Sequence, residues 1–245
     1  MTIRVSRNRV LLWALALLVI ALFTRLGVWL LARMHEKQAM LAASRAVLAE
    51  RRLQPLAIAG DPQRARTYDW AGGAGRFVDA PAVLLDNQAR DGRIGVHAYR
   101  AFQLAGGPGP LVLVDLGWLP LAGDRRMPAI AQPQGTLRLS GLLAPPPSPG
   151  LASDAPVRQA DGTLLTVALS IPALRQALRV SLAPRVLKLD PALPLGYARD
   201  LDILPNTMPP ERHLGYAVQW FGLALTVLVT ALVLTFRKPR SHPTP

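Results

Sequence analysis

The sequence has no cysteine among its 245 residues, and this absence removes several classes of function. Without cysteine there is no disulfide framework, no Cys-x-x-Cys redox or copper site and no thiolate zinc site. The five methionines are scattered along the chain, so no thioether copper cluster is visible. Acidic residues are also few, because 15 Asp and Glu stand against 28 Lys and Arg. The chain is therefore basic, and the positions of its charges decide what that means.

The basic residues are not distributed as in a nucleic-acid-binding protein. Six of them flank two apolar runs: Arg4, Arg7, Arg9, Arg237, Lys238 and Arg240. Residues 33–213 contain all 15 acids together with 21 of the bases, and no Lys/Arg run there is longer than two. Nucleic-acid recognition requires a basic patch or stripe on one face. We therefore predict no nucleic-acid partner.

The two apolar runs predict membrane spans. Residues 10–32 are interrupted only by Thr24 and Arg25, and residues 214–236 carry no charge. A helix of either length reaches roughly 34 Å, which covers a hydrocarbon core of about 30 Å. The basic tails place both termini in the cytoplasm by the positive-inside rule. We therefore predict an inner-membrane protein with a tail at 1–9, spans at 10–32 and 214–236, a periplasmic domain at 33–213 and a tail at 237–245.

A cleaved signal peptide is the alternative for the first run. Residues 10–23 alone form a 14-residue apolar stretch behind a basic start, which is typical of such a peptide. Arg25 follows at once, however, no Ala-x-Ala site lies at the right distance, and the apolar pattern resumes from Leu26 to Leu31. A span is favoured. Because both cytoplasmic tails have only nine residues, a sensor with an inward output domain is excluded.

The middle of the chain predicts an antiparallel β-rich α+β domain. The first span continues as a helix through residues 33–52 and ends before Pro55. Short strand-like runs occupy residues 83–85, 111–114, 136–139, 164–169 and 185–189. Turn material is predicted at residues 72–75, 106–110 and 144–150. One helix is expected at residues 171–180, capped by Ser170 and with Pro172 in its first turn.

No catalytic constellation is present in the sequence. The glycines at 106–109 are not followed by Lys-Ser/Thr, and those at 72–75 lack the strand-to-helix setting of a dinucleotide fold. No nucleophile elbow occurs either. We therefore predict that the protein is not an enzyme.

The candidate binding residues lie where the two spans emerge on the same side. His213, Tyr216 and Trp220 form one helical stripe at the mouth of the second span. A matching stripe at steps of four ends the first span: Arg25, Trp29, Arg33 and Lys37. A large amphipathic ligand with acidic groups fits between two such stripes. The alternative is an interfacial aromatic belt with a snorkelling histidine, while His35, His97 and His242 have no such setting.

A small-residue face lies opposite the His213 stripe. It contains Gly215, Gly222 and Thr226, which suit close packing on another helix. The first span is the expected neighbour.

Several motifs resemble the Surfeit-type cytochrome c oxidase assembly factors. The two terminal ones are Leu26-Gly27-x-Trp29-x3-Arg33-x3-Lys37 and His213-Leu214-Gly215-Tyr216-Ala217-Val218-Gln219-Trp220-Phe221. Between them, in the family's order, come Gly75-Arg76-Phe77, Gly95-Val96-His97, the run LVLVDLGWLP at 111–120, and Gly141-Leu142 followed by Pro145-Pro146. The chain departs from the family at Leu30, where Gln is usual, at Leu116, where Arg is usual, and at Glu211-Arg212, where Asn-Asn is usual.

The resemblance implies a role in building haem-copper oxidases, with bacterial members handling haem a for the catalytic subunit. It makes His213 the expected iron ligand. Tyr216, Trp220 and Trp29 are expected beside the macrocycle, and Arg33 and Lys37 at its propionates. The expected partners are the cytochrome c oxidase catalytic subunit, the enzyme that makes haem a, and membrane lipid.

Two other functions remain open at the level of sequence. The same stripes would serve a cofactor-free scaffold that holds an oxidase subunit. A two-span polysaccharide chain-length regulator shares the topology, but such proteins need long helical extensions, which 19 Gly and 23 Pro argue against.

Overall fold

The computed structural model describes residues 7–123, 125–147, 155–203 and 209–237. Most of the two predicted tails and part of the predicted turn at 144–150 lie outside these residues. The chain divides into two compact units, which are Met1–Met40 with Met208–Pro245, and Leu41–Thr207. Each unit is described by itself.

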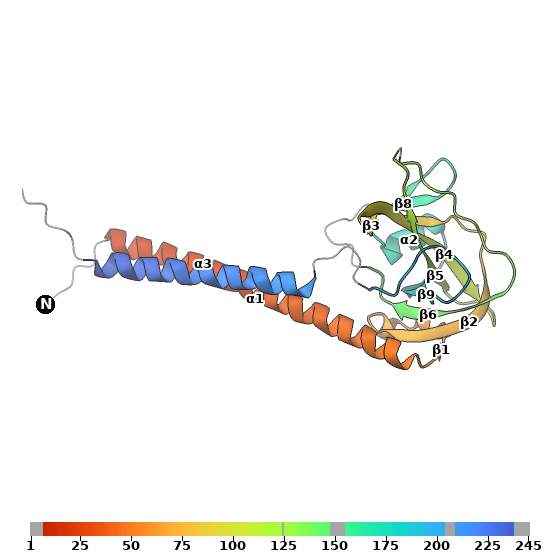
Figure 1. The fold of residues 1–245 in the computed structure, drawn as a ribbon, viewed down its shortest axis with the longest axis horizontal. Helices are drawn as coiled ribbons and strands as arrows, with labels where there is room; N and C mark the ends of the chain where they lie inside the picture. Colours follow the sequence, from red (N-terminus) through yellow and green to blue (C-terminus); the bar gives the residue numbers. More distant parts are fainter. Residues whose placement is uncertain (1–6, 124, 148–154, 204–208, 238–245) are drawn as a thin grey trace, which may run out of the picture. The chain divides into compact units, whose positions relative to one another are not determined.

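The first unit is a pair of long helices, α1 (Arg7–Glu50), whose residues from Leu41 on belong to the second unit, and α3 (Pro210–Phe236). They run side by side in Figure 1, and they are antiparallel because Trp13 contacts Thr235 while Phe23 contacts Trp220. Both helices are long and apolar enough to cross a membrane, and only 6% and 11% of their apolar windows are buried in the protein. Helix α1 continues without a break beyond residue 33, which confirms the predicted extension.

Gly27 of α1 lies directly against the ring of Phe221 of α3. A Cβ atom on Gly27 would lie 2.7 Å from two ring carbons of Phe221, so only a glycine admits that ring. One turn away, the rings of Phe23 and Trp220 pack with centroids 5.2 Å apart. Towards the chain ends, the Trp13 Nε1–H donates to Thr235 Oγ1 at 3.0 Å.

The predicted packing of Gly215 and Gly222 on the first span is wrong, whereas Thr226, from the same predicted face, lines a groove between the two helices. Nothing lies within 4 Å of a Cβ built on Gly215 or Gly222. The opposite face of α3, which carries the aromatic side chains, meets α1 instead, and Ala217 is fully buried there. The reason is steric. Small residues on one helix allow the other helix to approach closely. Here the small residue at the contact is Gly27 of α1, and the side chain that packs on it is the ring of Phe221 of α3.

The second unit contains one nine-stranded mixed sheet. Its strands are β1 (Gln54–Pro55), β2 (Asp69–Phe77), β3 (Val83–Arg90), β4 (Arg93–Leu104), β5 (Leu111–Pro120), β6 (Leu137–Ala144), β7 (Val157–Arg158), β8 (Leu164–Thr166) and β9 (Leu182–Leu189). Two short 3-10 helices, η1 (Leu56–Gly60) and η2 (Pro62–Arg64), and helix α2 (Ile171–Leu178) complete the unit.

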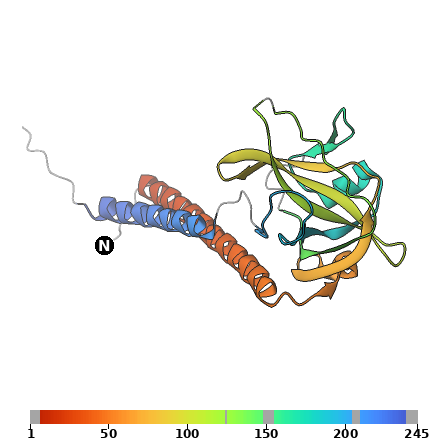
Figure 2. The ribbon, with the colours of Figure 1, turned by 45° about the vertical axis from the view of Figure 1, so that its right-hand side comes forward.

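The sheet closes on itself into a barrel (Figure 2). The strand order is β1-β2-β6-β9-β5-β4-β3-β8-β7, and β2 pairs with β4 as well as with β6. Strand β4 makes this possible because residues 93–99 pair with β3 while residues 102–104 pair with β2. Strands β2, β6, β9, β5 and β4 therefore form a closed ring.

The expectation of an antiparallel sheet is wrong in part, since three strand pairs are parallel. These pairs are β1–β2, β3–β8 and β5–β9. A parallel pair needs a long crossover connection. For β5 and β9 the connection contains β6, β7, β8 and α2, and no short-range pattern in the sequence marks that pairing.

The apolar side chains of the ring separate into an inner and an outer set. Val96, Phe102 and Leu187 belong to the large inner cluster, which η1 also joins through Leu56 and Ala59. A second cluster packs α2 on the sheet through Ile171, Leu174 and Leu178. A third packs Val47 and Leu48, at the end of α1, near Trp70.

Two buried arginines of the ring form hydrogen bonds with the connecting segments. Arg185 is fully buried and donates to Asp69 Oδ2 at 2.5 Å and to the carbonyl of Ile58 in η1. Arg100 donates to the carbonyl of Ile130 at 2.7 Å. Each guanidinium thus donates to a backbone carbonyl of a connecting segment, Ile58 for Arg185 and Ile130 for Arg100.

Most of the predicted elements are present. Strands β3, β5, β6, β8 and β9 contain or overlap the five predicted runs, and Ser170 caps α2 by accepting from the backbone N–H of Ala173. Strand β4 was not predicted, although it is the longest. The turn predicted at residues 72–75 is wrong, since these residues lie within β2.

The glycines of β2 serve close contacts in the ring. A Cβ on Gly75 would lie 2.1 Å from the carbonyl oxygen of Gln103 and 2.7 Å from the ring of Phe102. Gly75 pairs with both Leu137 of β6 and Leu104 of β4, so it occupies the point at which the ring closes. Glycine inside a strand often marks such a close approach of backbones.

We expect Gly75→Ala to destabilise the β unit by about 2 kcal/mol, because the added methyl group meets backbone that must move. Gly109→Ala is the matched control, since nothing lies within 4 Å of its Cβ and its φ is not positive. Thermal unfolding followed by tryptophan fluorescence measures both. Equal unfolding temperatures for the two variants would contradict this account of ring closure.

Candidate functional site

His213 lies in the first turn of α3, which begins at Pro210. Proline suits this position because the first helical N–H has no partner within the helix. Both ring nitrogens of His213 are buried, and neither has a hydrogen-bond partner among the described residues. Buried polar atoms are almost always paired, and an unpaired one calls for an explanation such as a role in binding a ligand. His213 is therefore the principal candidate for a binding residue.

Two cationic side chains of α1 lie close enough to His213 for their charges to act on it. The charges of Lys37 and Arg33 both act on its imidazole. Lys37 is half-buried, whereas Arg33 is exposed and forms an ion pair with Glu36 at 2.8 Å. The structure thus brings together one imidazole from α3 and two cations from α1.

The aromatic candidates take different positions. Trp220 packs against Phe23, so it belongs to the contact between the helices. Tyr216 and Trp29 are 45% and 54% exposed, and the Arg33 guanidinium lies 5.8 Å from the Trp29 ring. Arg25 is exposed. Tyr216 and Trp29 are therefore available to a ligand, while Trp220 first of all holds the two helices together.

These residues fit a haem group. An unpaired imidazole supplies the single protein donor that iron in a macrocycle needs, and Lys37 with Arg33 supplies cations for two carboxylates. Exposed aromatic rings on both helices supply flat apolar surface.

A second polar cluster lies in the β unit, on the outer side of the ring. Asp115 of β5 is 3% exposed, and its carboxylate lies 3.1 Å from His97 Nδ1 of β4 and 3.2 Å from Lys188 Nζ of β9. The backbone N–H of Gly117 also donates to Asp115, at 2.9 Å. The cluster therefore links three adjacent strands of the ring.

The electrostatics of this cluster favour a charged Asp115. Burial alone would raise the pKa of Asp115. The charges of Lys188 and His97, together with the hydrogen bonds from His97 and Gly117, outweigh burial and hold the pKa of Asp115 well below its usual range. Asp115 also helps to raise the pKa of Tyr99, which burial raises first of all.

No role for Asp115 or Lys188 was predicted from the sequence, although a signal for both was present. Asp115 is the one charge in its apolar strand, between Val114 and Leu116, and Lys188 stands between Leu187 and Leu189 in a strand whose other charge is Arg185. Charges in buried strands are usually paired. The contact of Gly27 with Phe221 was also missed, although Phe23, Gly27, Leu30 and Met34 follow a helical spacing of three and four.

A comparison with models of protein families shows to which family this chain belongs. The model of the SURF1 family matches residues 17–225. The chain belongs to the SURF1 family. The match covers the β unit, the part of α1 with Trp29, Arg33 and Lys37, and the part of α3 with His213. None of the curated proteins matches the chain.

Members of the SURF1 family are assembly factors associated with cytochrome oxidase. This agrees with the resemblance of the sequence motifs. The match gives no support to a polysaccharide chain-length regulator.

We expect Asp115→Asn in this SURF1-family chain to cost about 3 kcal/mol of stability, because it leaves Lys188 buried beside a neutral amide. Asp91→Asn is the control, since that side chain is 90% exposed. Thermal unfolding of the full chain in detergent at pH 7 measures both. Similar stabilities of the two variants would contradict the pairing.

The same cluster predicts a dependence on pH. Since the folded-state pKa of Asp115 is depressed, its stabilisation is complete above the unfolded pKa of about 3.9 and is lost as the pH falls below that value. Wild type is expected to lose more stability than Asp115→Asn on acidification from pH 5 to pH 3. Parallel losses in the two proteins would show that Asp115 does not titrate in this way.

Proposed function

We propose that this SURF1-family chain is an assembly factor of cytochrome c oxidase, anchored in the inner membrane by α1 and α3, that binds haem a transiently for the catalytic subunit. The observation that carries the proposal is His213, whose two buried nitrogens have no hydrogen-bond partner among the described residues, while the charges of Lys37 and Arg33 act on its imidazole.

The apolar surface of the helix pair supports the membrane anchor. Leucine and valine side chains are exposed along both helices, for example Leu18 at 64% and Val233 at 56%. Contiguous apolar surface of this extent is not stable against water. By the positive-inside rule the basic chain ends lie in the cytoplasm, and His213 lies on the opposite side.

In this proposal each residue at the site contacts a different part of the haem. A neutral imidazole is a good iron ligand, and His213 offers one. Lys37 and Arg33 are placed to hold carboxylate groups by charge-assisted hydrogen bonds. Tyr216 and Trp29 provide exposed rings that exclude water from a flat ligand.

The packing of His213 suits a transient complex. Its nitrogens are buried in the present arrangement, so binding a ligand requires the side chain to turn outward. The free energy of that rearrangement opposes binding. A site with a single protein donor and such a cost holds its cargo loosely enough to pass it on.

The test is a visible spectrum of the protein purified in detergent from cells that make haem a. Wild type is expected to show a Soret band close to one haem per chain, and His213→Ala to lose or shift it. His35→Ala is the matched control, because His35 is an exposed histidine of α1.

Equal and negligible absorbance in wild type and His213→Ala would refute haem binding. If the protein still purified with the oxidase subunit in that case, it would be the cofactor-free scaffold, and Arg33, Lys37 and Tyr216 would form a docking surface.

We expect Gly27→Val to weaken haem retention as well, because its side chain would meet Phe221 and move α3, with His213, away from Lys37. Gly215→Val is the matched control, since nothing lies within 4 Å of a Cβ there. The ratio of Soret to protein absorbance measures the effect. Equal ratios in the two variants would show that haem retention does not depend on the contact between Gly27 and Phe221.

A further inference from the structure

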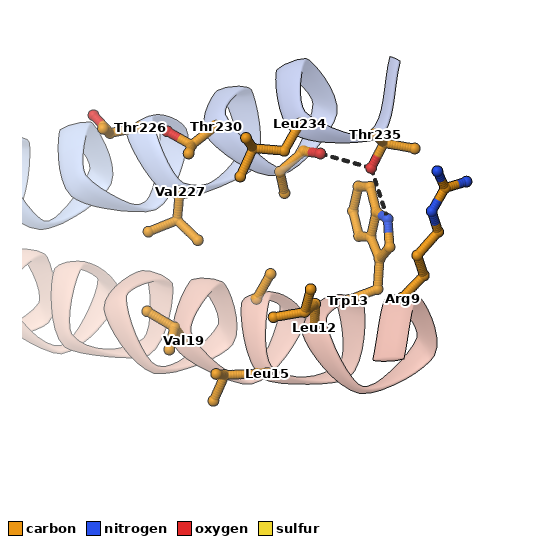
Figure 3. A pocket seen from close by; sticks show the side chains of 12 residues that line it. Arg9, Leu12, Trp13, Leu15, Val19, Thr226, Val227, Thr230, Leu234 and Thr235 are labelled. Atoms are coloured by element: carbon orange, nitrogen blue, oxygen red, sulfur yellow. Dashed lines mark hydrogen bonds between the residues drawn. The ribbon is translucent and has the colours of Figure 1, made fainter. Parts of the chain in front are cut away.

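A groove of about 490 Å³ lies between α1 and α3, near the ends of the helices that carry the chain termini (Figure 3). Twelve residues line it: Arg9, Leu12, Trp13, Leu15, Ala16, Val19, Thr226, Val227, Thr230, Ala231, Leu234 and Thr235. The first of these on α3, Thr226, is 13 residues beyond His213, or about 20 Å along the helix. The groove is therefore separate from the proposed haem site.

The wall of the groove is apolar. Leu12, Val19, Val227 and Leu234 point their side chains between the helices in Figure 3. The hydroxyl of Thr226 donates to its own helix, at 2.8 Å from the Gly222 oxygen, so it is not free for a ligand. The Thr235 hydroxyl does the same at 2.7 Å from Ala231 and accepts from Trp13. Such a wall suits a hydrocarbon chain.

One end of the groove carries positive charge. The hydrogen bond between Trp13 and Thr235 closes that end, and the Arg9 side chain lies next to it (Figure 3). Arg9 has no ion-pair partner within the described part of the chain. Arg7 and Arg237 are exposed at the same end of the helix pair. An anionic group at this end would meet complementary charge.

We propose that the groove binds one anionic phospholipid, with an acyl chain between the helices and the phosphate at Arg9. Basic pockets between membrane helices on the cytoplasmic side bind anionic headgroups. A helix about 10 Å wide would fill 490 Å³ with roughly one turn, so a partner helix fits the groove less well than an acyl chain. The inference rests on the proposed membrane anchor.

The test is native mass spectrometry of the full chain in detergent, titrated with dioleoylphosphatidylglycerol or dioleoylphosphatidylcholine. Wild type is expected to bind one phosphatidylglycerol in preference to phosphatidylcholine. Arg9→Gln should weaken phosphatidylglycerol binding about fivefold and leave phosphatidylcholine unchanged, because one basic side chain contributes about that much near an anionic headgroup. Ala16→Leu should weaken the binding of both lipids by filling the groove.

Two matched controls accompany these variants. Arg45→Gln removes an exposed arginine of α1 far from the groove, and Ala14→Leu adds the same bulk at an exposed α1 position outside it. Both should bind lipid as wild type does. An equal loss in Ala14→Leu and Ala16→Leu, or an unchanged phosphatidylglycerol affinity in Arg9→Gln, would overturn the proposal.

A different result would indicate that the groove binds a helix of a partner protein. If Ala16→Leu lost the oxidase subunit in purification but kept its lipid, the lipid proposal would be wrong. Alkaline extraction of membranes tests the anchor independently. A chain that stayed in the membrane without preference for phosphatidylglycerol would refute the lipid proposal alone, whereas a chain released by alkali would refute the membrane anchor.

Discussion

The helix unit depends on one steric fit, in which Gly27 of α1 receives the ring of Phe221 of α3. Without a side chain at residue 27 the two helices approach closely, and two pairs nearer the N-terminus of α1, Phe23 with Trp220 and Trp13 with Thr235, also come into contact. The same contact holds the first turns of α3 next to the part of α1 that carries Arg33 and Lys37. His213 is consequently held where the charges of two α1 side chains reach it.

The β unit has a corresponding constraint at the point of ring closure. Strand β4 is long enough to pair with β3 and then with β2, and Gly75 leaves room for the backbone of β4. Across the ring, Asp115 ties β4, β5 and β9 together with polar contacts. A closed ring has no free edge among its five strands. The features of both units that matter most are thus glycines at close contacts and charges paired in apolar surroundings.

The sequence predicted those features that depend on local patterns. The apolar runs gave both helices, and alternating or branched residues gave five strands, since burial on one face leaves a short-range signal. The mixed sheet was missed because the parallel pairing of β5 with β9 joins segments about 70 residues apart. The glycines of β2 were read as a turn because the backbone that they approach lies on other strands, as Gln103 of β4 does for Gly75, and no local pattern in the sequence marks that contact. The position of His213 followed from its motif, but the burial of its nitrogens, which have no partner within the described part of the chain, depends on the packing of the helices and could not be predicted.

The proposed role of His213 in handling haem a is best tested by the haem a content of the oxidase itself. Catalytic subunit would be purified from cells with wild type, His213→Ala or His35→Ala as the only copy of this factor, and its haem a measured per subunit. We expect less haem a with His213→Ala and a normal content with His35→Ala. A normal content with His213→Ala, in cells where deletion of the factor lowers it, would contradict that role.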